Sequence, residues 1–207
     1  MTKQEHIYVI DDDELVLDTL KGILFCAGFA VKTYSSAQAF LDEFKPMQRG
    51  CLVVDLKMPG LDGLALQELM QQKSIALPVI FLSGAADISS AVQAMANGAY
   101  TFLQKPVNNQ ELISAIKTAM AEHEKKEQLA APAKEARQSL SVLSERELKI
   151  ALLATEGLSA GAIAEKLFIS TRTVEAHKAS IFAKLSINTI AQLTRLVVLA
   201  NYSSINT

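Results

Sequence analysis

The sequence lacks two features that would place a protein in a membrane or direct it through one. No apolar run approaches the ~18 to 20 residues that a membrane-spanning helix requires. The segment Met1–Glu5 is short and mostly polar and leads directly into the apolar run Ile7–Ile10, which is not the pattern of a signal peptide. We therefore expect a cytoplasmic protein that has no membrane partner.

Cysteine is also scarce, since the chain has only Cys26 and Cys51. Both lie in apolar stretches, and neither has a histidine or a second cysteine at the spacing of a metal site. Cysteines in such surroundings usually behave as small buried hydrophobic residues. The pattern indicates buried, reduced thiols rather than a disulfide or a metal site, as expected in the cytosol.

Charge is nearly balanced over the whole chain, at a formal net charge of −2, but the two ends differ. Residues 1–122 have nine Lys and Arg against fourteen Asp and Glu, a net charge of −5. Residues 123–207 have eleven against eight, a net charge of +3. The acidic part suits a metal ion. The basic part permits contact with phosphate backbones, but its charge is too weak to indicate DNA by itself.

Residues 1–122 alternate short apolar or β-branched runs with segments of helical periodicity. The runs at 51–54 and 79–82 are apolar throughout, as in strands that are covered on both faces. We therefore predict an α/β domain with a doubly wound, five-stranded parallel sheet. The strands are expected at 7–10, 30–34, 51–55, 79–83 and 101–105, and the helices at 14–27, 37–44, 63–72, 88–97 and 109–122.

Residues 123–142 have closely spaced opposite charges and no apolar face. We interpret them as a charged, partly helical linker, whose first half extends the preceding helix. Pro132 is expected to interrupt that helix, because a proline inside a helix costs about 3 kcal/mol.

Residues 143–207 show only helical patterns and predict a second, smaller, all-α domain. Ser144 and Glu147 form a capping box that begins a helix, and Gly157 ends this helix with a left-handed cap. Ser170 is the expected N-cap of the third helix, which follows the second after a tight turn, as in a helix-turn-helix. The four helices are expected at 144–155, 159–167, 171–185 and 188–200.

Charged and hydroxyl residues follow the ends of four predicted strands. Because the carboxyl ends of parallel strands meet at one edge of a sheet, these side chains are expected to share one pocket. A single acidic residue at a strand end is usually only a turn former or a helix cap, but their joint placement favours a site. The residues are Asp11, Asp12, Asp55, Ser83 and Lys105.

The chemistry of this pocket suits a divalent cation and a phosphoryl group. Asp55 is the predicted nucleophile, because it lies at a strand end and is followed by a turn. Asp11, Asp12 and Asp55 are the predicted ligands of Mg²⁺, and the backbone carbonyl of Lys57 completes the protein ligands. The cation would relieve the repulsion among the clustered carboxylates.

Lys105 and Ser83 are suited to bind phosphoryl oxygens through an ammonium charge and a hydroxyl hydrogen bond. With these residues, segment 6–122 resembles the receiver domain of two-component response regulators, which has a flavodoxin-like fold. The matching motifs are Val9–Asp13, Asp55–Gly60 with Asp62 and Gly63, Ser83–Gly84 and Lys105–Pro106. The resemblance implies that a sensor histidine kinase donates a phosphoryl group to Asp55, with catalysis mainly through positioning and charge stabilisation.

The same resemblance implies a switch formed by Ser83 and Phe102. When the Ser83 hydroxyl moves to a phosphoryl oxygen, Phe102 rotates into the space that it leaves. Tyrosine is common at this position in the family, so with phenylalanine the switch depends on packing alone. The alternative is that Phe102 is an ordinary core residue.

The resemblance also implies that the chain forms an isologous homodimer when it is phosphorylated. Regulators of this family commonly dimerise through one surface of the receiver. Here that surface is expected on 88–97, 101–105 and 109–122.

Segment 143–200 resembles the LuxR-type helix-turn-helix, and the whole chain resembles the NarL/FixJ family, closest to its FixJ branch. The matching stretches are Leu143–Glu147, Gly157–Leu167, Ile169–Ser170, Thr173–His177 and Lys184–Leu185. The resemblance implies a regulator of transcription that binds double-stranded DNA, with RNA polymerase as a further candidate partner.

Helical periodicity predicts which side of segment 171–185 reads DNA. Val174, Ile181 and Leu185 recur at helical spacing and are expected to face the bundle. The opposite side would enter the major groove. It consists of Arg172, Glu175, Ala176, Ala179 and Ala183.

On this side Glu175 is suited to accept a hydrogen bond from a cytosine amino group, and Ala176 or Ala179 to contact a thymine methyl group. His177 is either a phosphate contact or hydrogen-bonded within the bundle. The predicted phosphate contacts are Thr171, Arg172, Thr173, Lys178 and Lys184.

Two alternatives remain open. Aspartyl-phosphate phosphohydrolases also place a nucleophilic carboxylate and Mg²⁺ at strand ends, but they carry a second carboxylate two residues after the nucleophile. This chain has Lys57 there, so we do not expect an enzyme. The other alternative is an adaptor that accepts phosphate and uses its four helices to bind only protein.

Overall fold

The computed structural model describes residues 5–45, 48–84 and 88–200. The chain divides into two compact units, Met1–Lys125 and Lys126–Thr207, and the boundary falls within the predicted linker, 123–142. The outermost residues of the predicted domains 1–122 and 143–207 lie outside the described residues.

The described part of the first unit contains a five-stranded parallel sheet in the order β2-β1-β3-β4-β5. This is the strand order of a doubly wound, flavodoxin-like α/β fold, so the predicted fold class is confirmed. The strands are β1 (Glu5–Ile10), β2 (Ala30–Tyr34), β3 (Arg49–Asp55), β4 (Val79–Ser83) and β5 (Thr101–Gln104).

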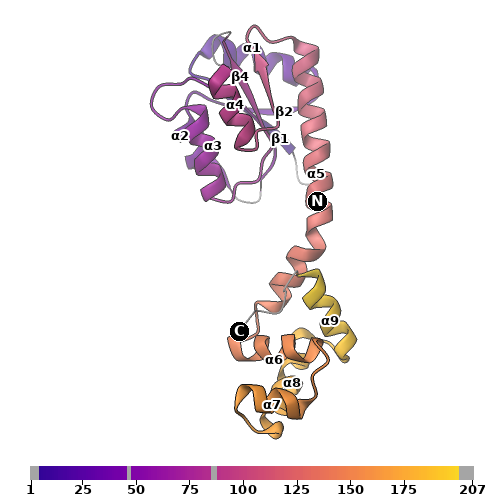
Figure 1. The fold of residues 1–207 in the computed structure, drawn as a ribbon. Coiled ribbons are helices and arrows are strands. Elements are labelled where there is room, and N and C mark those ends of the chain that lie inside the picture. Colours follow the sequence, from indigo (N-terminus) through magenta and orange to yellow (C-terminus); the bar gives the residue numbers. More distant parts are fainter. Residues whose placement is uncertain (1–4, 46–47, 85–87, 201–207) are drawn as a thin grey trace. The chain divides into compact units, whose positions relative to one another are not determined.

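Helices cover both faces of this sheet (Figure 1). On one face, Phe40, Leu66 and Ala94 pack against the sheet from three different helices, and on the other Leu24 and Ile116 do so. Both faces are therefore buried, which explains the continuously apolar central strands. The helices are α1 (Glu14–Cys26), α2 (Ala37–Glu43), α3 (Gly63–Gln72), α4 (Ile88–Ala96) and α5 (Asn109–Leu140).

Two acidic residues near the predicted pocket begin helices. Asp13 accepts a hydrogen bond from the Leu15 amide at 2.8 Å and caps α1, and Asp62 accepts one from the Ala65 amide at 2.8 Å and caps α3. These caps fix the directions in which the chain leaves β1 and β3. The carboxylates of Asp13 and Asp62 are thus used in the local structure.

Gly63 allows α3 to start close to the end of β3. A Cβ atom at this position would lie 2.6 Å from the Asp55 carbonyl oxygen and 2.8 Å from Cε1 of Phe81. The Gly63 amide donates to the Leu56 carbonyl at 3.1 Å, which closes the turn that follows Asp55. The position of Asp55 therefore depends on a residue that has no side chain.

We predict that Gly63→Ala lowers the free energy of unfolding by roughly 1–3 kcal/mol, because overpacking displaces backbone as well as side-chain atoms. Gly22→Ala in α1 is the matched control, since its Cβ would meet nothing within 4 Å. It should raise the free energy of unfolding by about 0.5–1 kcal/mol. Urea denaturation measures both. Equal stability of Gly63→Ala and the wild type would contradict the close approach of α3 to β3.

The predicted break in helix α5 at Pro132 is wrong. Pro132 was expected to interrupt the helix, but α5 continues from Asn109 to Leu140 with Pro132 inside it. Strong helix formers surround the proline on both sides. In addition, Ala136 and Leu140 are buried in the core of the second unit. Tertiary packing after the proline thus offsets its local cost, and the sequence pattern could not show this packing.

The prediction that both cysteines are buried is wrong for one of them. Cys51 is buried in the sheet as predicted, but Cys26 is exposed. The buried side of α1 carries Leu17, Leu20 and Leu24, and a residue two positions after Leu24 lies on the opposite side of the helix. The apolar stretch around Cys26 is therefore buried on only one side of α1. Both thiols are free.

The second unit is a small helical bundle, as predicted. Its core includes Ile150, Ile163, Val174, Ile181 and Leu193, which come from four helices. These helices are α6 (Glu145–Thr155), α7 (Ala160–Leu167), α8 (Thr171–Leu185) and α9 (Ile190–Leu199).

The predicted helix caps of this unit are confirmed. Ser144 and Glu147 form a capping box at the start of α6, and Gly157 follows α6 with a φ of +87°. Ser170 accepts a hydrogen bond from the Thr173 amide at 3.1 Å and begins α8. Ser170 thus fixes the start of α8 after the tight turn that follows α7.

No single helix in the described part of the chain is long and apolar enough to cross a membrane. Helices α8 and α9 meet the length and composition test only as a pair, which is bent by 66°.

Candidate functional site

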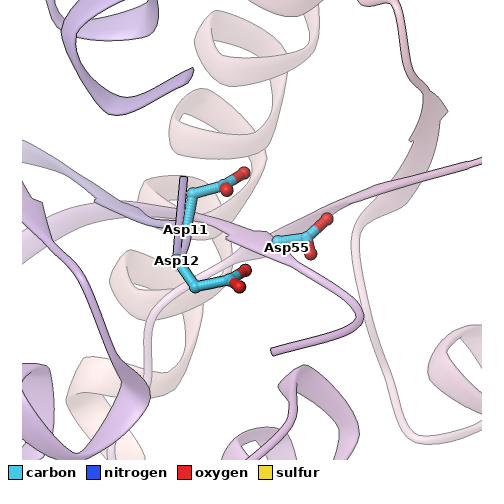
Figure 2. A group of neighbouring side chains, drawn as sticks. All are labelled: Asp11, Asp12 and Asp55. Carbon is cyan, nitrogen blue, oxygen red and sulfur yellow. The ribbon is translucent and has the colours of Figure 1, made fainter. Parts of the chain in front are cut away.

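Three carboxylates meet at the carboxyl end of the sheet. Asp11 and Asp12 follow β1, and Asp55 ends β3. One oxygen from each lies within 4.8 Å of the others, and Figure 2 shows the three side chains next to one another. Asp11 and Asp55 are buried, whereas Asp12 is exposed. The structure thus brings together the acidic residues that the sequence predicted to share a pocket.

Lys105 connects two of these carboxylates. Its Nζ lies 2.6 Å from Oδ2 of Asp11 and 2.8 Å from Oδ1 of Asp55. Burial alone would lower the pKa of Lys105, but the hydrogen bonds to Asp11 and Asp55 outweigh it and raise this pKa. The lysine is therefore a fixed positive charge beside the predicted nucleophile. The peptide bond between Lys105 and Pro106 is cis.

Burial is the main influence on the Asp55 carboxyl and raises its pKa above the ordinary value. The charge of Asp11 acts in the same direction. Lys105 and a backbone hydrogen bond from Lys57 act in the opposite direction. Asp55 is thus held by one side chain and by the turn that follows it.

The donor set of this pocket fits a magnesium ion. Carboxylate oxygens are the hard ligands that Mg²⁺ prefers, and the exposed Asp12 leaves the cluster accessible to water. Lys57 lies in the turn directly after β3, and its backbone contact with Asp55 keeps it beside the cluster. The predicted use of its carbonyl as a ligand remains a prediction.

Ser83 and Phe102 lie on neighbouring strands. Ser83 ends β4 and is buried, and its hydroxyl donates to the Gly84 carbonyl at 3.2 Å. Phe102 of β5 is paired in register with Phe81 and is half-buried against one face of the core. The predicted switch formed by Ser83 and Phe102 remains a prediction.

The exposed side of α8 agrees with the sequence prediction. Val174 and Ile181 are buried, and Leu185 is half-buried against the same core. The predicted outer residues are all exposed, namely Arg172, Glu175, Ala176, Ala179 and Ala183. Helical periodicity thus separated the two sides of α8 correctly.

The predicted phosphate contacts of α8 differ in their surroundings. Thr171 and Arg172 are exposed, whereas Thr173 and His177 are half-buried. The Thr173 hydroxyl lies 2.8 Å from that of the N-cap Ser170. Lys178 donates to Glu175 Oε1 at 3.3 Å. The basic group of Lys178 thus lies beside the acidic group predicted to read a base.

A groove of about 550 Å³ runs beside this part of α8. Glu175, Lys178 and Ala179 line one wall, and Asn188 and Thr189 at the start of α9 line another. Sequence reasoning did not single out Asn188 or Thr189, because they lie outside α8 and match no base-reading pattern. Their polar groups extend the candidate DNA surface beyond α8.

Lys184 has an unexpected partner. Its Nζ lies 2.7 Å from Oε2 of Glu147, a buried carboxylate in the first turn of α6. The Ser180 hydroxyl donates to the other oxygen of Glu147 at 2.8 Å. The capping-box motif predicted the local role of Glu147 but not these contacts with α8.

The Glu147 carboxyl should make the stability of the second unit depend on pH. Hydrogen bonds from Lys184, the Ser144 backbone and Ser180 lower its pKa from 4.5 to about 2. A lowered pKa in the folded state gives stability that is complete above about pH 4.5 and is lost as the pH falls toward 2.

Calorimetry of the full chain between pH 2 and 6 measures this effect. Glu147→Gln should flatten the decline of the unfolding temperature in this window, while Glu145→Gln, on the exposed side of the same turn, should leave it unchanged. Identical pH profiles for Glu147→Gln and the wild type would contradict a strongly perturbed carboxyl.

The first unit has a flavodoxin-like fold with three clustered carboxylates and a lysine at its strand ends, and a helix-turn-helix unit follows it in the chain. This combination defines a two-component response regulator of transcription. Comparison with known families agrees with this class. Residues 7–117 match the response regulator receiver domain, and residues 141–197 match the bacterial regulatory proteins of the luxR family. The chain belongs to the FixJ-like response regulators, which join a receiver to a LuxR-type DNA-binding domain.

Individual relatives cover almost the whole chain. The transcriptional regulatory protein FixJ of Bradyrhizobium diazoefficiens is 38% identical over 97% of this chain and 98% of its own. TdiR of Thauera aromatica is 35% identical, with 93% and 85% covered.

Solved structures agree. The response regulator StyR has a TM-score of 0.73 at 36% identity and covers 94% of this chain and 98% of its own. Full-length FixJ from B. japonicum has a TM-score of 0.59 at 37% identity, with 96% and 98% covered.

Proposed function

We propose that Asp55 accepts a phosphoryl group from a sensor histidine kinase and that this modification controls dimerisation and sequence-specific binding to double-stranded DNA. The observation that carries the proposal is the position of Asp55, with Lys105 at 2.8 Å and the carboxylates of Asp11 and Asp12 beside it. RNA polymerase is a further partner of the proposed regulator, and the cytoplasm is its proposed location.

In the proposed reaction a carboxylate oxygen of Asp55 attacks the phosphorus of the kinase phosphohistidine. The bond between phosphorus and the imidazole nitrogen breaks, and its electron pair remains on the imidazole. Lys105, already in contact with Asp55, moves its charge to a phosphoryl oxygen. The Ser83 hydroxyl donates to another oxygen, and Phe102 packs into the space that Ser83 leaves.

Magnesium is the proposed cofactor. Asp11, Asp12, Asp55 and the backbone carbonyl of Lys57 would hold it, and it would neutralise the charge of the phosphoryl oxygens. Two of these carboxylates are buried side by side, so a second positive charge besides Lys105 would relieve their repulsion.

We assign this pocket to the acceptance of a regulatory phosphoryl group rather than to the catalytic turnover of a substrate. The chain has Lys57 where a phosphohydrolase of the D-x-D type has its second carboxylate. The motif around Asp55 therefore lacks the second carboxylate, which would be a general acid or base beside the nucleophile. The membership in a family of transcription regulators supports the same assignment.

The proposed DNA-binding residues divide into two groups. Glu175, Ala176 and Ala179 read bases from the exposed side of α8. The proposed phosphate contacts are Thr171, Arg172, Thr173, His177 and Lys178. Lys184, which the sequence also predicted as a phosphate contact, is paired with Glu147 at 2.7 Å. The groove between α8 and the start of α9 supports a DNA-binding surface that extends from α8 to Asn188 and Thr189.

The proposed dimer uses α4, β5 and the start of α5. Val92 and Met95 are exposed apolar residues on α4, with 65% and 46% of their surface accessible, which supports this surface. Phosphorylation should convert the wild type from monomer to dimer in sedimentation velocity experiments. Val92→Glu should prevent this conversion. Leu15→Glu, at an apolar position on α1 that is 78% exposed, should not.

A small phosphodonor with Mg²⁺ drives the test, so that no kinase is needed. A monomer both before and after phosphorylation would contradict the dimer. Equal dimerisation of the Val92→Glu and Leu15→Glu variants would place the interface elsewhere.

A further inference from the structure

Glu147 has more hydrogen-bond partners than a helix cap requires. Its Oε2 accepts from the Ser144 amide and hydroxyl, both at 2.9 Å, and from Lys184 at 2.7 Å. Its Oε1 accepts from the Ser180 hydroxyl at 2.8 Å. Only 4% of the residue is exposed. The carboxylate thus joins the first turn of α6 to the second half of α8.

The capping box alone does not explain this burial. A capping glutamate needs only the amide of the N-cap residue, and many such residues remain in water. Taking a carboxylate out of water is unfavourable unless it is paired and fully hydrogen-bonded. Ser180 and Lys184, which compensate for the burial of this carboxylate, come from α8. The buried carboxylate therefore serves the contact between α6 and α8.

The two partners on α8 are placed to fix its orientation. Ser180 and Lys184 are four residues apart and lie one above the other on the same side of the helix. At 3.6 residues per turn, this side lies beside the outer side that carries Ala176 and Ala179. Two contacts one turn apart restrain both the rotation of α8 about its axis and its shift along that axis.

We propose that Glu147 is a positioning residue for DNA reading, which holds α8 so that Glu175, Ala176 and Ala179 face outward. The proposal rests on the proposed DNA-binding function. It also changes the role of Lys184, whose ammonium group is used to bind Glu147 instead of a DNA phosphate. Glu147 itself touches no DNA.

The two roles of Lys184 have different signatures in salt dependence. A lysine that binds a phosphate releases a counterion, so its loss reduces the slope of log affinity against log salt by about 0.9 and weakens binding to all sequences. A positioning lysine leaves this slope unchanged, and its loss weakens binding to the preferred site more than to unrelated DNA.

The experiment uses the full-length protein, a DNA site selected by the wild type and an unrelated sequence. The variants are Lys184→Met, Glu147→Gln and the double variant that combines these two substitutions. Ser180→Ala is a milder change, because it removes only the hydroxyl that donates to Glu147. Lys149→Ala, an exposed lysine on α6, is the control. Affinities are measured over a series of salt concentrations, at a temperature where circular dichroism shows each variant folded.

Each single variant should lose roughly tenfold more affinity for the selected site than for unrelated DNA, with an unchanged salt slope. The double variant should lose no more than the worse single variant, because both break the same contact. Lys149→Ala should keep the wild-type preference among sequences.

Other results would overturn the proposal. Equal losses on both DNAs with a reduced slope for Lys184→Met would make Lys184 a phosphate contact. Lower thermal stability with an unchanged preference would leave Glu147 only a structural role. A wild type that prefers no sequence would instead contradict the proposed function itself, so the two failures are distinguishable.

Discussion

Incubation with a small phosphodonor and Mg²⁺ should add the mass of one phosphoryl group to the wild type and none to Asp55→Asn. Asp55 is one of the three clustered carboxylates, lies at the end of β3 and has the Lys105 Nζ at 2.8 Å. Asparagine keeps the size of the side chain but provides no carboxylate oxygen for attack on phosphorus. Intact mass spectrometry measures the result directly.

Asp62→Asn is the matched control for this prediction. Asp62 lies in the same βα connection, but its carboxylate caps α3 through the Ala65 amide. Asparagine is also a good N-cap, so this variant should fold and gain one phosphoryl group. Modification of Asp55→Asn would reveal a different acceptor, and no modification of the wild type would remove the proposed mechanism.

The second large effect concerns α8. Lys178→Ala should weaken binding to all DNA sequences and reduce the salt slope by about 0.9, because it removes one phosphate contact. Glu175→Ala should change the preference among sites, with about 1–3 kcal/mol at the base pair that Glu175 reads. Gel retardation with excess competitor DNA measures both effects. Specific retardation would also exclude the alternative that the chain is an adaptor that binds only protein.

The contact between these two residues requires a further variant. Lys178 donates to Glu175 at 3.3 Å, so the removal of Glu175 also frees the lysine. Glu175→Gln keeps a hydrogen-bonding side chain without the charge and separates the two effects. Equal losses on every sequence for Lys178→Ala and Glu175→Ala would contradict the division between phosphate and base contacts.

Much of the receiver pocket could be predicted because it depends on strand ends. In a parallel sheet the topology alone brings Asp11, Asp55, Ser83 and Lys105 to one edge, without any information on side-chain packing. The ion pairs of Lys105 with both carboxylates are a detail of this arrangement.

Contacts between helices could not be predicted in the same way. The capping box of Glu147 is a local pattern and was visible in the sequence, but its contact with Lys184 joins residues 37 positions apart. Nothing in the spacing distinguishes this lysine from the other basic residues of α8. The sequence therefore predicted a phosphate contact for Lys184 and could not show its ion pair with Glu147.

The errors at Pro132 and Cys26 have related causes. Local propensity predicted a helix break at Pro132, but packing of the following turns into the second core outweighs it. Local hydrophobicity predicted a buried Cys26, but the helix turns this residue away from the sheet. In both cases tertiary packing decided the outcome, and it depends on residues far away in the sequence.

Phosphorylation of Asp55 is proposed to control DNA binding. Titration of a labelled, selected DNA site with the wild type and with Asp55→Asn, each with and without phosphodonor and Mg²⁺, measures this control. The phosphodonor should increase the affinity of the wild type roughly 5- to 150-fold, the usual range of coupling between two sites, and leave Asp55→Asn unchanged. The same affinity for phosphorylated and unphosphorylated wild type, with phosphorylation verified by mass, would contradict the proposed control.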